Sequence, residues 1–382
     1  MARIYLDHAA TTPARPEVVE AMVPLLGGGF NPSSLHAEGR AARAAVDGAR
    51  ETVARVLGAA PREIVFTGGG SEADVLAVVG AARALRERGR HVVTTSIEHH
   101  AVLHAVEVLE HDGWRVTRLP VDARGLVNPA AFAAALTPQT TVASVMLANN
   151  ETGVVQPVAQ LAGLARERGV LFHTDAVQAA GWLSLDVRVL GADLLSLSAH
   201  KFHGPKGVGV LYVRRGTPLE PLIVGGGQEH GLRAGTENVA GIAGFATAIA
   251  LADADRPVTA ARVAALRDRL QAGIVASIPD VLVNGADAQR LPGILSVAFA
   301  EAPSDALLMR LDLDGIAASA GSACAAGSLE PSHVVAALGL GERYRLGVVR
   351  FSLGRATTDA EIADVLDRLP SLVASVRTPL TV

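Results

Sequence analysis

Short apolar runs alternate with helix-like stretches between about residues 60 and 215 of the chain. Apolar runs of about four to eight residues that end at turn residues are typical of strands, and longer stretches with a period near 3.6 are typical of helices. Their alternation predicts an α/β fold, in which a mostly parallel sheet is covered by helices on both faces. The seven predicted strands are residues 63–67, 91–96, 115–121, 141–148, 170–176, 193–199 and 208–213.

The pattern changes beyond about residue 255. A long amphipathic stretch, 259–278, is followed by shorter strand-like and helix-like segments, which indicates a smaller α+β unit. The polar stretch 252–259 is the predicted break between the two units. The sequence therefore predicts a large domain over 16–254 and a small domain made of 1–15 and 255–382.

Composition narrows the class of protein. Of the 382 residues, 49% are hydrophobic and 19% are charged, as in soluble globular enzymes. A net charge of −4 and an aromatic content of 3% argue against a nucleic-acid-binding surface. The longest run of small and apolar residues, 239–252, is too short to span a bilayer, and the N-terminus lacks the pattern of a secretory signal. A single cysteine excludes an internal disulfide framework and predicts a reducing, cytoplasmic location.

Only two lysines occur among the 34 lysines and arginines, and they lie five residues apart, at Lys201 and Lys206. Arginine cannot act as an amine nucleophile, because its pKa stays above about 12. Lys201 follows the predicted strand 193–199, and the carboxyl ends of parallel strands form the ligand crevice of such sheets. We therefore expect Lys201 to form a Schiff base with a carbonyl cofactor, the alternative being a structural lysine in a turn.

Two further segments suit such a cofactor. Asp175 ends the predicted strand 170–176, where its carboxylate can pair with a protonated pyridine nitrogen, and Gln178 can reach the phenolic oxygen. A helix cap is the alternative for Asp175. A glycine-rich turn leads from strand 63–67 into a helix at Gly70 and Ser71, which predicts a phosphate cradle or simply a tight turn. Ser198 and His200 are further candidate phosphate ligands.

Three histidines, His99, His100 and His104, follow the strand at 91–96. A metal site would pair His100 with His104, but the spacing lacks the HExxH order and no acidic or cysteine ligand follows at a suitable distance. We expect no metal, and instead expect His99 to lie over a cofactor ring and transfer protons.

The lone cysteine, Cys324, is surrounded by Gly, Ala and Ser. A free cysteine is often a small buried hydrophobe, but this setting favours a mobile loop, about 317–329, that carries a nucleophilic thiolate. Arg350 lies in a strand-like run, where its guanidinium can hold a substrate carboxylate or pair with a nearby acidic residue.

Taken together, these segments resemble the motifs of NifS/IscS-type cysteine desulfurases, in the class V aminotransferase branch of the fold-type I pyridoxal phosphate enzymes. The resemblance runs from residue 4 to about 360 and includes "YLDHAATTP", "NPSSLHAEGR", "IVFTGGGSEAD", "EHHAV", "MLANNETGVVQP", "HTDAVQ", "SAHKFHGPKGVG", "GGGQEHGLRAGTEN", "SAGSACAAGSLEPSH" and "VRFSLGR". It implies that Lys201 bonds to the cofactor, that Asp175 pairs with its ring nitrogen, that His99 stacks on the ring and that Gln178 contacts the phenolic oxygen.

The resemblance also implies the remaining roles. Gly70, Ser71, Ser198 and His200 would bind the phosphate, together with Thr236 from the other subunit of a homodimer. Asn150 and Arg350 would hold the carboxylate of L-cysteine. Cys324 would accept the substrate's sulfur as a persulfide while L-alanine leaves, and would then pass the sulfur to an acceptor protein such as an iron–sulfur scaffold or a tRNA-thiolating enzyme.

The chain departs from the family pattern at two places. Val75 stands where relatives usually have Asn, and the chain ends at Val382, which predicts that it lacks the longer tail some relatives use to dock a scaffold. Two alternatives stay open. A selenocysteine lyase or another class V aminotransferase would share the fold, and a non-catalytic scaffold that has kept the fold would carry no cofactor.

Overall fold

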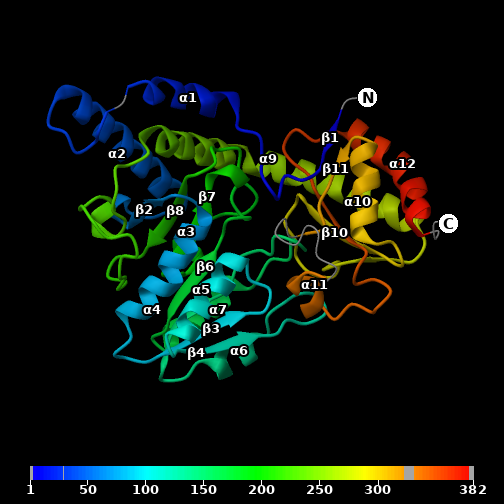
Figure 1. Cartoon of the computed structure of the whole chain (residues 1–382), viewed down its shortest axis with the longest axis horizontal. Helices are drawn as coiled ribbons and strands as arrows, with labels where there is room; N and C mark the ends of the chain where they lie inside the picture. Colours follow the sequence, from blue (N-terminus) through cyan, green and yellow to red (C-terminus); the bar gives the residue numbers. More distant parts are fainter. Residues whose placement is uncertain (1–2, 29, 322–330, 378–382) are drawn as a thin grey trace.

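The computed structural model describes residues 3–28, 30–321 and 331–377, and the chain forms two lobes of unequal size (Figure 1). The larger lobe contains α1 (Pro16–Leu26), α2 (Ala37–Leu57), β2 (Ile64–Thr67), α3 (Gly70–Val75), α4 (Ala81–Ala84), β3 (His91–Thr95), α5 (His100–His111), β4 (Arg115–Leu119), α6 (Pro129–Ala135), β5 (Thr140–Ser144), α7 (Val158–Glu167), β6 (Leu171–Asp175), α8 (Val187–Leu190), β7 (Leu194–Ser198), β8 (Gly209–Val213) and the first half of α9 (Val239–Ser277). Short 3₁₀ turns cover Pro61–Glu63, Ala199–Lys201 and Glu229–Gly231.

The central sheet of the larger lobe has seven strands in the order β2-β8-β7-β6-β5-β3-β4. β8 is antiparallel to both of its neighbours, and the pairs from β7 to β4 are all parallel. The mostly parallel sheet predicted from the sequence is therefore confirmed, and each predicted strand overlaps one of these seven.

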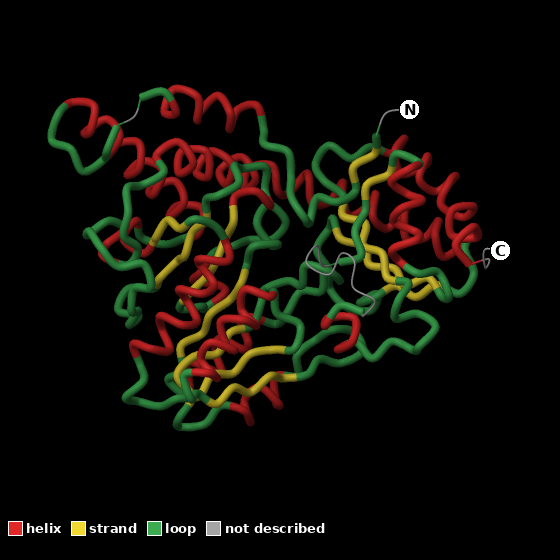
Figure 2. The backbone as a smooth tube through the Cα atoms, in the orientation of Figure 1, coloured by secondary structure: helices red, strands yellow, loops and turns green. Residues whose placement is uncertain are grey.

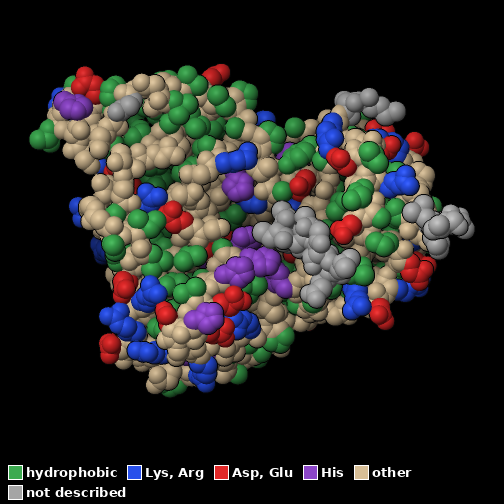
Figure 3. All heavy atoms as spheres, in the orientation of Figure 1, with side chains coloured by type: hydrophobic (Ala, Val, Ile, Leu, Met, Phe, Trp, Pro, Cys, Tyr) green, Lys and Arg blue, Asp and Glu red, His purple; other side chains and the backbone are tan. Residues whose placement is uncertain are grey.

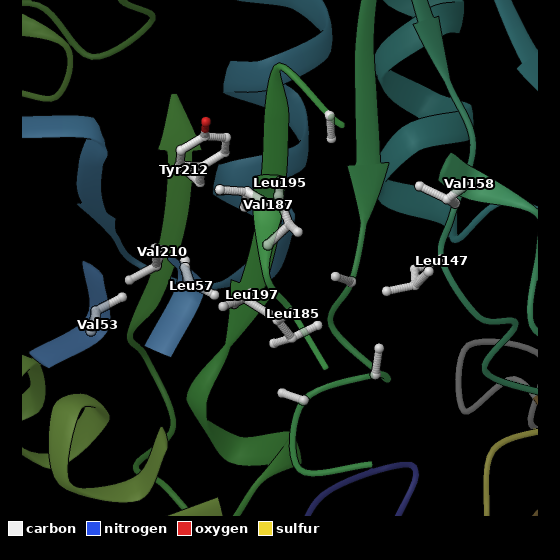
Figure 4. Close-up of a cluster of buried hydrophobic side chains, with 14 of the residues drawn as sticks. Val53, Leu57, Leu147, Val158, Leu185, Val187, Leu195, Leu197, Val210 and Tyr212 are labelled. Atoms are coloured by element: carbon white, nitrogen blue, oxygen red, sulfur yellow. The ribbon is translucent and has the colours of Figure 1, made fainter. Parts of the chain in front are cut away.

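Helices cover both faces of this sheet, as Figure 2 shows for the larger lobe. On one face, α2 and α9 enclose an apolar core in which Val53 and Leu57 meet Leu197 and Val210 (Figure 4). On the other face, α3 and α5 bury a second apolar cluster against the same strands. Because both faces are covered, the strands other than β4 are buried along most of their length, and their apolar residues do not simply alternate with exposed ones.

The helix that leads from β2 differs from the prediction. The sequence predicts one helix over 71–89, but α3 passes into a π-helical turn, Leu76–Gly80, before α4 completes the segment. A π turn widens the backbone locally, so the side chains before and after it point in directions that a regular period does not predict.

The smaller lobe contains β1 (Ile4–Tyr5), β9 (Val281–Val283), β10 (Ile294–Phe299), α10 (Ser304–Leu313), β11 (Ile316–Ala317), α11 (His333–Ala337), β12 (Val348–Ser352) and α12 (Asp359–Arg377). β12, β10 and β9 form an antiparallel sheet, and β1 pairs in parallel with β11. The N-terminal strand thus belongs to the smaller lobe, although α1 lies on the larger one (Figure 1).

The stretch 252–259, where the sequence predicts the boundary between the two units, is not a loop, because α9 runs through it as one helix that includes Pro257. The apolar core nevertheless changes partner there. Residues of α9 up to Ala252 pack in the larger lobe, and residues from Val263 onward pack in the smaller lobe. Among the described residues, no helix has the length and apolar character needed to cross a membrane.

Candidate active site

A cavity of about 230 Å³ opens where the two lobes meet, at the carboxyl ends of β6 and β7. This is the edge at which parallel α/β sheets bind ligands. Ten of the residues singled out in the sequence line it: Gly70, Ser71, His99, Asn150, Asp175, Gln178, Ser198, His200, Lys201 and Arg350. Residues more than two hundred positions apart are therefore brought to one place by the fold.

Lys201 lies in the 3₁₀ turn that follows β7. Its Nζ donates to the carbonyl oxygens of Ala9 and Ala10, at 2.6 and 2.8 Å, in the N-terminal segment. Burial lowers the pKa of Lys201 to about 8, and the positive charge of Arg350 contributes in the same direction. A larger fraction of this amine is therefore unprotonated at neutral pH than for an exposed lysine.

Asp175 is the last residue of β6 and is almost completely buried. Its Oδ1 accepts a hydrogen bond of 2.8 Å from the backbone N–H of Val177. Burial raises the pKa of Asp175 to about 6, while the Val177 amide and Lys201 act in the opposite direction. A cation placed in the cavity would therefore readily shift this carboxyl group to its ionised form. Gln178, three residues on, donates from Nε2 to the Ala9 carbonyl at 2.8 Å.

His99 is the N-cap of α5, and its Nδ1 accepts from the backbone N–H of Ala101 at 3.1 Å. Burial lowers the pKa of His99 to about 4, with Lys201 as the next cause. The imidazole is therefore neutral at physiological pH. Because Nδ1 is the acceptor, the proton of the ring is on Nε2.

The polar cradle at the start of α3 combines backbone and side-chain groups. The first N–H groups of a helix have no partner within the helix, so those at Gly70 and Ser71 are available to an anion. A Cβ at Gly70 would lie 2.9 Å from Val177 Cγ2 and 3.2 Å from Ser198 Cβ, so only glycine brings the backbone this close. His200 is neutral as well, because burial and Lys201 lower its pKa to about 4.

Arg350 reaches the cavity from β12 of the smaller lobe, with its side chain 2% exposed. Its Nη2 lies 2.9 Å from Asp7 Oδ1, and its Nη1 donates to the carbonyl oxygens of Asn150 and Gly321. Among the described residues, Nε has no hydrogen-bond partner. Both sequence-based readings of Arg350 therefore have a structural basis, since it forms an ion pair and also lines the cavity.

Two predicted site residues are not part of this cavity as described. Thr236 is exposed and follows the loop after β8, and it does not line the cavity among the residues that the structure covers. Cys324 lies outside the described residues, as does most of the predicted loop 317–329. Gly321, the last described residue before Cys324, lines the cavity.

Three buried carboxyl groups at or beside the site were not predicted as functional: Asp74 and Glu151, which line the cavity, and Glu98, which does not. Burial raises the pKa of all three groups, that of Glu98 to about 8. Each lies close in sequence to a predicted residue, since Glu98 precedes His99, Glu151 follows Asn150 and Asp74 is three residues after Ser71. That adjacency was the available signal. It was missed because charged residues beside a site are ordinarily solvent-facing.

Histidine side chains gather in the middle of the face where the two lobes meet (Figure 3). The rings of His100 and His333 lie 4.7 Å apart, and those of His100 and His104 lie 5.5 Å apart. His333 Nε2 lies 2.8 Å from the Glu98 carbonyl oxygen. Among the described residues, the three groups whose potential ligand atoms converge within 4.8 Å are instead Asp74, His99 and Asp175.

Comparison with known proteins places this geometry in context. The family model described as Aminotransferase class-V matches residues 4–365. A relative named cysteine desulfurase IscS from Dictyoglomus turgidum is 46% identical over 376 residues, which are 98% of this chain and 95% of the relative. A relative named cysteine desulfurase from Cereibacter sphaeroides is 49% identical over 381 residues, which are 99% of this chain and 97% of the relative.

Two solved structures are also similar. One, described as a NifS-like protein, has a TM-score of 0.92 and 36% identity and covers 98% of this chain and 100% of its own. The other, described as SspA in complex with cysteine, has a TM-score of 0.82 and 38% identity and covers 93% of this chain and 100% of its own.

Proposed function

We infer that this chain, which belongs to the Aminotransferase class-V family, is a cysteine desulfurase dependent on pyridoxal phosphate. The observation that carries this conclusion is identity of 46–49% with cysteine desulfurases over nearly the whole chain. The substrate is L-cysteine, and the sulfur passes to acceptor proteins.

The residues around the cavity fit the cofactor. A buried amine at Lys201 and a buried carboxyl group at Asp175 line the same cavity, next to a cradle in which Gly70 leaves no room for a Cβ. We assign the aldehyde of the cofactor to Lys201, its ring nitrogen to Asp175 and its phosphate to Gly70, Ser71, Ser198 and His200. Pyridoxal phosphate supplies an aldehyde that bonds to amines and a ring that withdraws electrons from the neighbouring carbon atoms.

The chain's own residues would then perform the following tasks. Lys201, with its pKa near 8, presents a free amine for bonding and for accepting a proton from the substrate's α-carbon. His99, neutral and protonated on Nε2, is placed to donate a proton or stack on the ring. Arg350 and Asn150 orient the substrate carboxylate, and Arg350 Nε is free among the described residues for that contact.

We assign sulfur transfer to Cys324. Its thiolate attacks the sulfur of L-cysteine, so that an S–S bond forms while the C–S bond of the substrate breaks, and the carbon takes a proton to give L-alanine. The persulfide on Cys324 then reaches an acceptor, for which we propose an iron–sulfur scaffold or a tRNA-thiolating enzyme. We also propose a cytoplasmic location, because Cys324 must stay a reduced thiol between turnovers.

The test adds L-cysteine to purified holoenzyme, measures L-alanine, and looks by mass spectrometry for one added sulfur atom on Cys324. We expect both products in the wild type, and an imine at Lys201 that borohydride traps. Cys324→Ser should lose more than about 99% of sulfur release while keeping the trapped imine. Sulfur release that persists in Cys324→Ser would instead identify a selenocysteine lyase or an aminotransferase, and a colourless protein with no imine would identify a non-catalytic scaffold.

We further propose a homodimer in which Thr236 completes the phosphate cradle of the other subunit. In support, the cradle has an open outer side, a cavity of about 420 Å³ that shares Gly70, Ser71, Ser198 and His200 with the main cavity and also contains Lys206. The segment that carries Thr236 is anchored by Glu237, which pairs with Arg43 at 2.8 Å, while Val224 nearby is 78% exposed. Such an apolar, exposed residue is suited to an interface.

Mixed dimers test this arrangement. Lys201→Ala and Thr236→Ala chains are unfolded together, refolded and compared with each variant alone. If Thr236 acts across the interface, each mixed dimer contains one intact site, and activity returns. If Thr236 acts within its own subunit, every site keeps one defect and no activity returns.

A further inference from the structure

A row of buried polar side chains crosses the central sheet beneath the cavity. Ser144 on β5, His173 on β6 and Ser196 on β7 are each completely or almost completely inaccessible to solvent. Ser144 Oγ lies 2.8 Å from His173 Nδ1, and Ser196 Oγ lies 2.9 Å from His173 Nε2. Three adjacent strands are therefore linked by hydrogen bonds between side chains in an interior that is otherwise apolar.

Asp74 meets this row from α3. Its side chain is 1% exposed, and Oδ1 lies 3.6 Å from His173 Nε2, too far for a hydrogen bond. Among the described residues, Asp74 Oδ1 has no hydrogen-bond partner. His173 is not a counter-ion either, because burial lowers its pKa to about 3 and leaves the ring neutral. An ionised carboxylate at this position would be buried without a compensating positive charge, which is costly.

Asp175 lies next to Asp74, and ligand atoms of Asp74, Asp175 and His99 all fall within 4.8 Å of one another. Two carboxyl groups this close in a dry site do not both ionise. Asp175 is the better site for the negative charge, because it accepts the Val177 N–H and is stabilised by Lys201. Burial raises the pKa of Asp74 well above its ordinary value, and Asp175 is the second cause.

All titratable groups that face Asp74 point to the same charge distribution. They are Asp175 and His173 on β6, and Glu98 and His99 before α5. Glu98 is itself fully buried, and burial raises its pKa to about 8, so it too is neutral at physiological pH. Lys201 acts on Asp175 rather than on Asp74. The groups around Asp74 therefore carry a single negative charge, which is on Asp175.

We propose that Asp74 is a protonated positioning residue, whose neutral carboxyl group joins the buried row Ser144–His173–Ser196 behind Asp175 and confines the negative charge to Asp175. This inference rests on the proposed function, in which Asp175 holds the ring nitrogen of pyridoxal phosphate. Asp74 takes no part in bond making. It acts through Asp175, by keeping that side chain oriented and by carrying no competing charge. The π-helical turn that follows α3 supports such a role, since such turns occur often beside functional sites.

Three variants separate this role from general stability. Asp74→Asn keeps the shape and the neutral state, Asp74→Leu keeps the approximate volume but removes the polar group, and Thr174→Val is the matched control. Thr174 lies between His173 and Asp175 on β6, is completely buried, and its Oγ1 has no hydrogen-bond partner among the described residues. Alternate side chains of a strand point to opposite faces, so Thr174 is on the face away from the row.

The first measurement uses the cofactor-free protein, so it does not depend on activity. The infrared difference between the wild type and Asp74→Asn at pH 7 should contain the C=O band of a protonated carboxylic acid in the wild type. A carboxylate band at that pH would overturn the proposal. So would a divalent ion bound in stoichiometric amount with loss of the acid band, because Asp74 would then be a metal ligand.

The second measurement is the dissociation constant of pyridoxal phosphate, with the pH at which the absorbance of the bound cofactor changes. We expect Asp74→Asn and Thr174→Val to stay within about threefold of the wild type, and Asp74→Leu to bind about tenfold or more weakly with a shifted pH profile. Equal losses in Asp74→Asn and Asp74→Leu would overturn the proposal. If Asp74→Leu fails to fold, the infrared band of the wild type and the cofactor affinity of Asp74→Asn still test the proposal. Absence of a borohydride-trapped imine in the wild type would contradict the proposed function while leaving the infrared result intact.

Discussion

Lys201 and Lys206, the two lysines of the chain, have different surroundings in the folded protein. Lys201 is partly buried at the cavity wall, whereas Lys206 is exposed at the rim of the outer cavity. The difference follows from the turn after β7, which turns Lys201 back toward the N-terminal segment. Burial lowers the pKa of Lys201, which is why we assign the covalent role to it.

This difference predicts how cofactor capture depends on pH. With a pKa near 8, about a tenth of the Lys201 side chains carry a free amine at pH 7, and acidification lowers that fraction. The rate at which cofactor-free protein forms the imine should therefore rise through pH 8 and level off well below pH 10.5. Stopped-flow absorbance measures this rate. A rate that still climbs steadily above pH 10 would contradict the lowered pKa.

Arg350 supplies the second cause of the shift, so Arg350→Gln should move the profile to higher pH. Arg355→Gln is the control, because Arg355 follows β12 and is not among the causes of the Lys201 pKa shift. If the two variants had the same pH profile of imine formation, burial alone would set the pKa of the Lys201 amine.

The cavity residues that could be recognised in the sequence are those whose type or position is unusual. Lysine was recognisable by its rarity, and Asp175 and His99 by their places after predicted strands. Asp74 and His173 were not recognisable, because their significance lies in a side-to-side row across three strands. Neighbours in that row are distant in sequence, and no periodicity of a single strand reveals them.

At the scale of elements, β2, β8 and the start of α3 are held together by an unusually close approach. A Cβ at Gly209, the first residue of β8, would lie 2.5–2.8 Å from backbone atoms of Gly69. Gly69 directly precedes the phosphate cradle. The absence of a side chain at position 209 is what lets the glycine-rich turn pack against the sheet.

Gly209→Ala should therefore displace the turn, since backbone cannot rotate away as a side chain can. We expect pyridoxal phosphate to bind more than about tenfold more weakly, because the backbone N–H groups of the cradle lose their positions. Equilibrium dialysis of the cofactor measures the change. Gly163→Ala in α7 is the matched control, because a Cβ there meets no described atom within 4 Å. It should leave cofactor binding unchanged and raise stability by up to about 1 kcal/mol. Unaltered binding in Gly209→Ala would show that the close approach is not needed.

The strands were predictable because burial on both faces makes most of them short runs rich in apolar and β-branched residues with clear ends. The course of α9 was not, since its polar stretch around Pro257 resembles a linker. In the structure those polar residues lie where the helix leaves one apolar core and enters the next. A helix that passes from one apolar core to the next therefore has the same local sequence pattern as a linker between domains. Only the packing of the two lobes distinguishes the two cases.

At the scale of the whole molecule, Asp255 on α9 joins segments of both lobes. Its Oδ2 lies 2.8 Å from Nη1 of Arg15, which precedes α1, and 3.7 Å from Nε of Arg355, which follows β12. The Arg15 side chain is only 6% exposed, and among the described residues its Nε has no hydrogen-bond partner. Asp255 is therefore the main partner of a buried cation.

Asp255→Ala should lower the free energy of unfolding by about 1–3 kcal/mol, because it leaves the Arg15 guanidinium buried and uncompensated. Urea denaturation measures this change. Asp253→Ala, two residues earlier on the same helix, removes a partly exposed ion pair with Arg256 and should cost less than about 1 kcal/mol. If both variants lose the same stability, the buried ion pair does not join the lobes in the way we describe.

The pairing of β1 with β11 has a consequence for how the protein is made. Ile4 lies opposite Ile316, so β1 has no partner until β11 has been translated. The carbonyl groups of Ala9 and Ala10, which follow β1, are the ones that hold the Lys201 ammonium group. The Lys201 amine of a nascent chain is therefore still unconstrained when it is translated, and only the arrival of β11, in the last fifth of the polypeptide, fixes it in place.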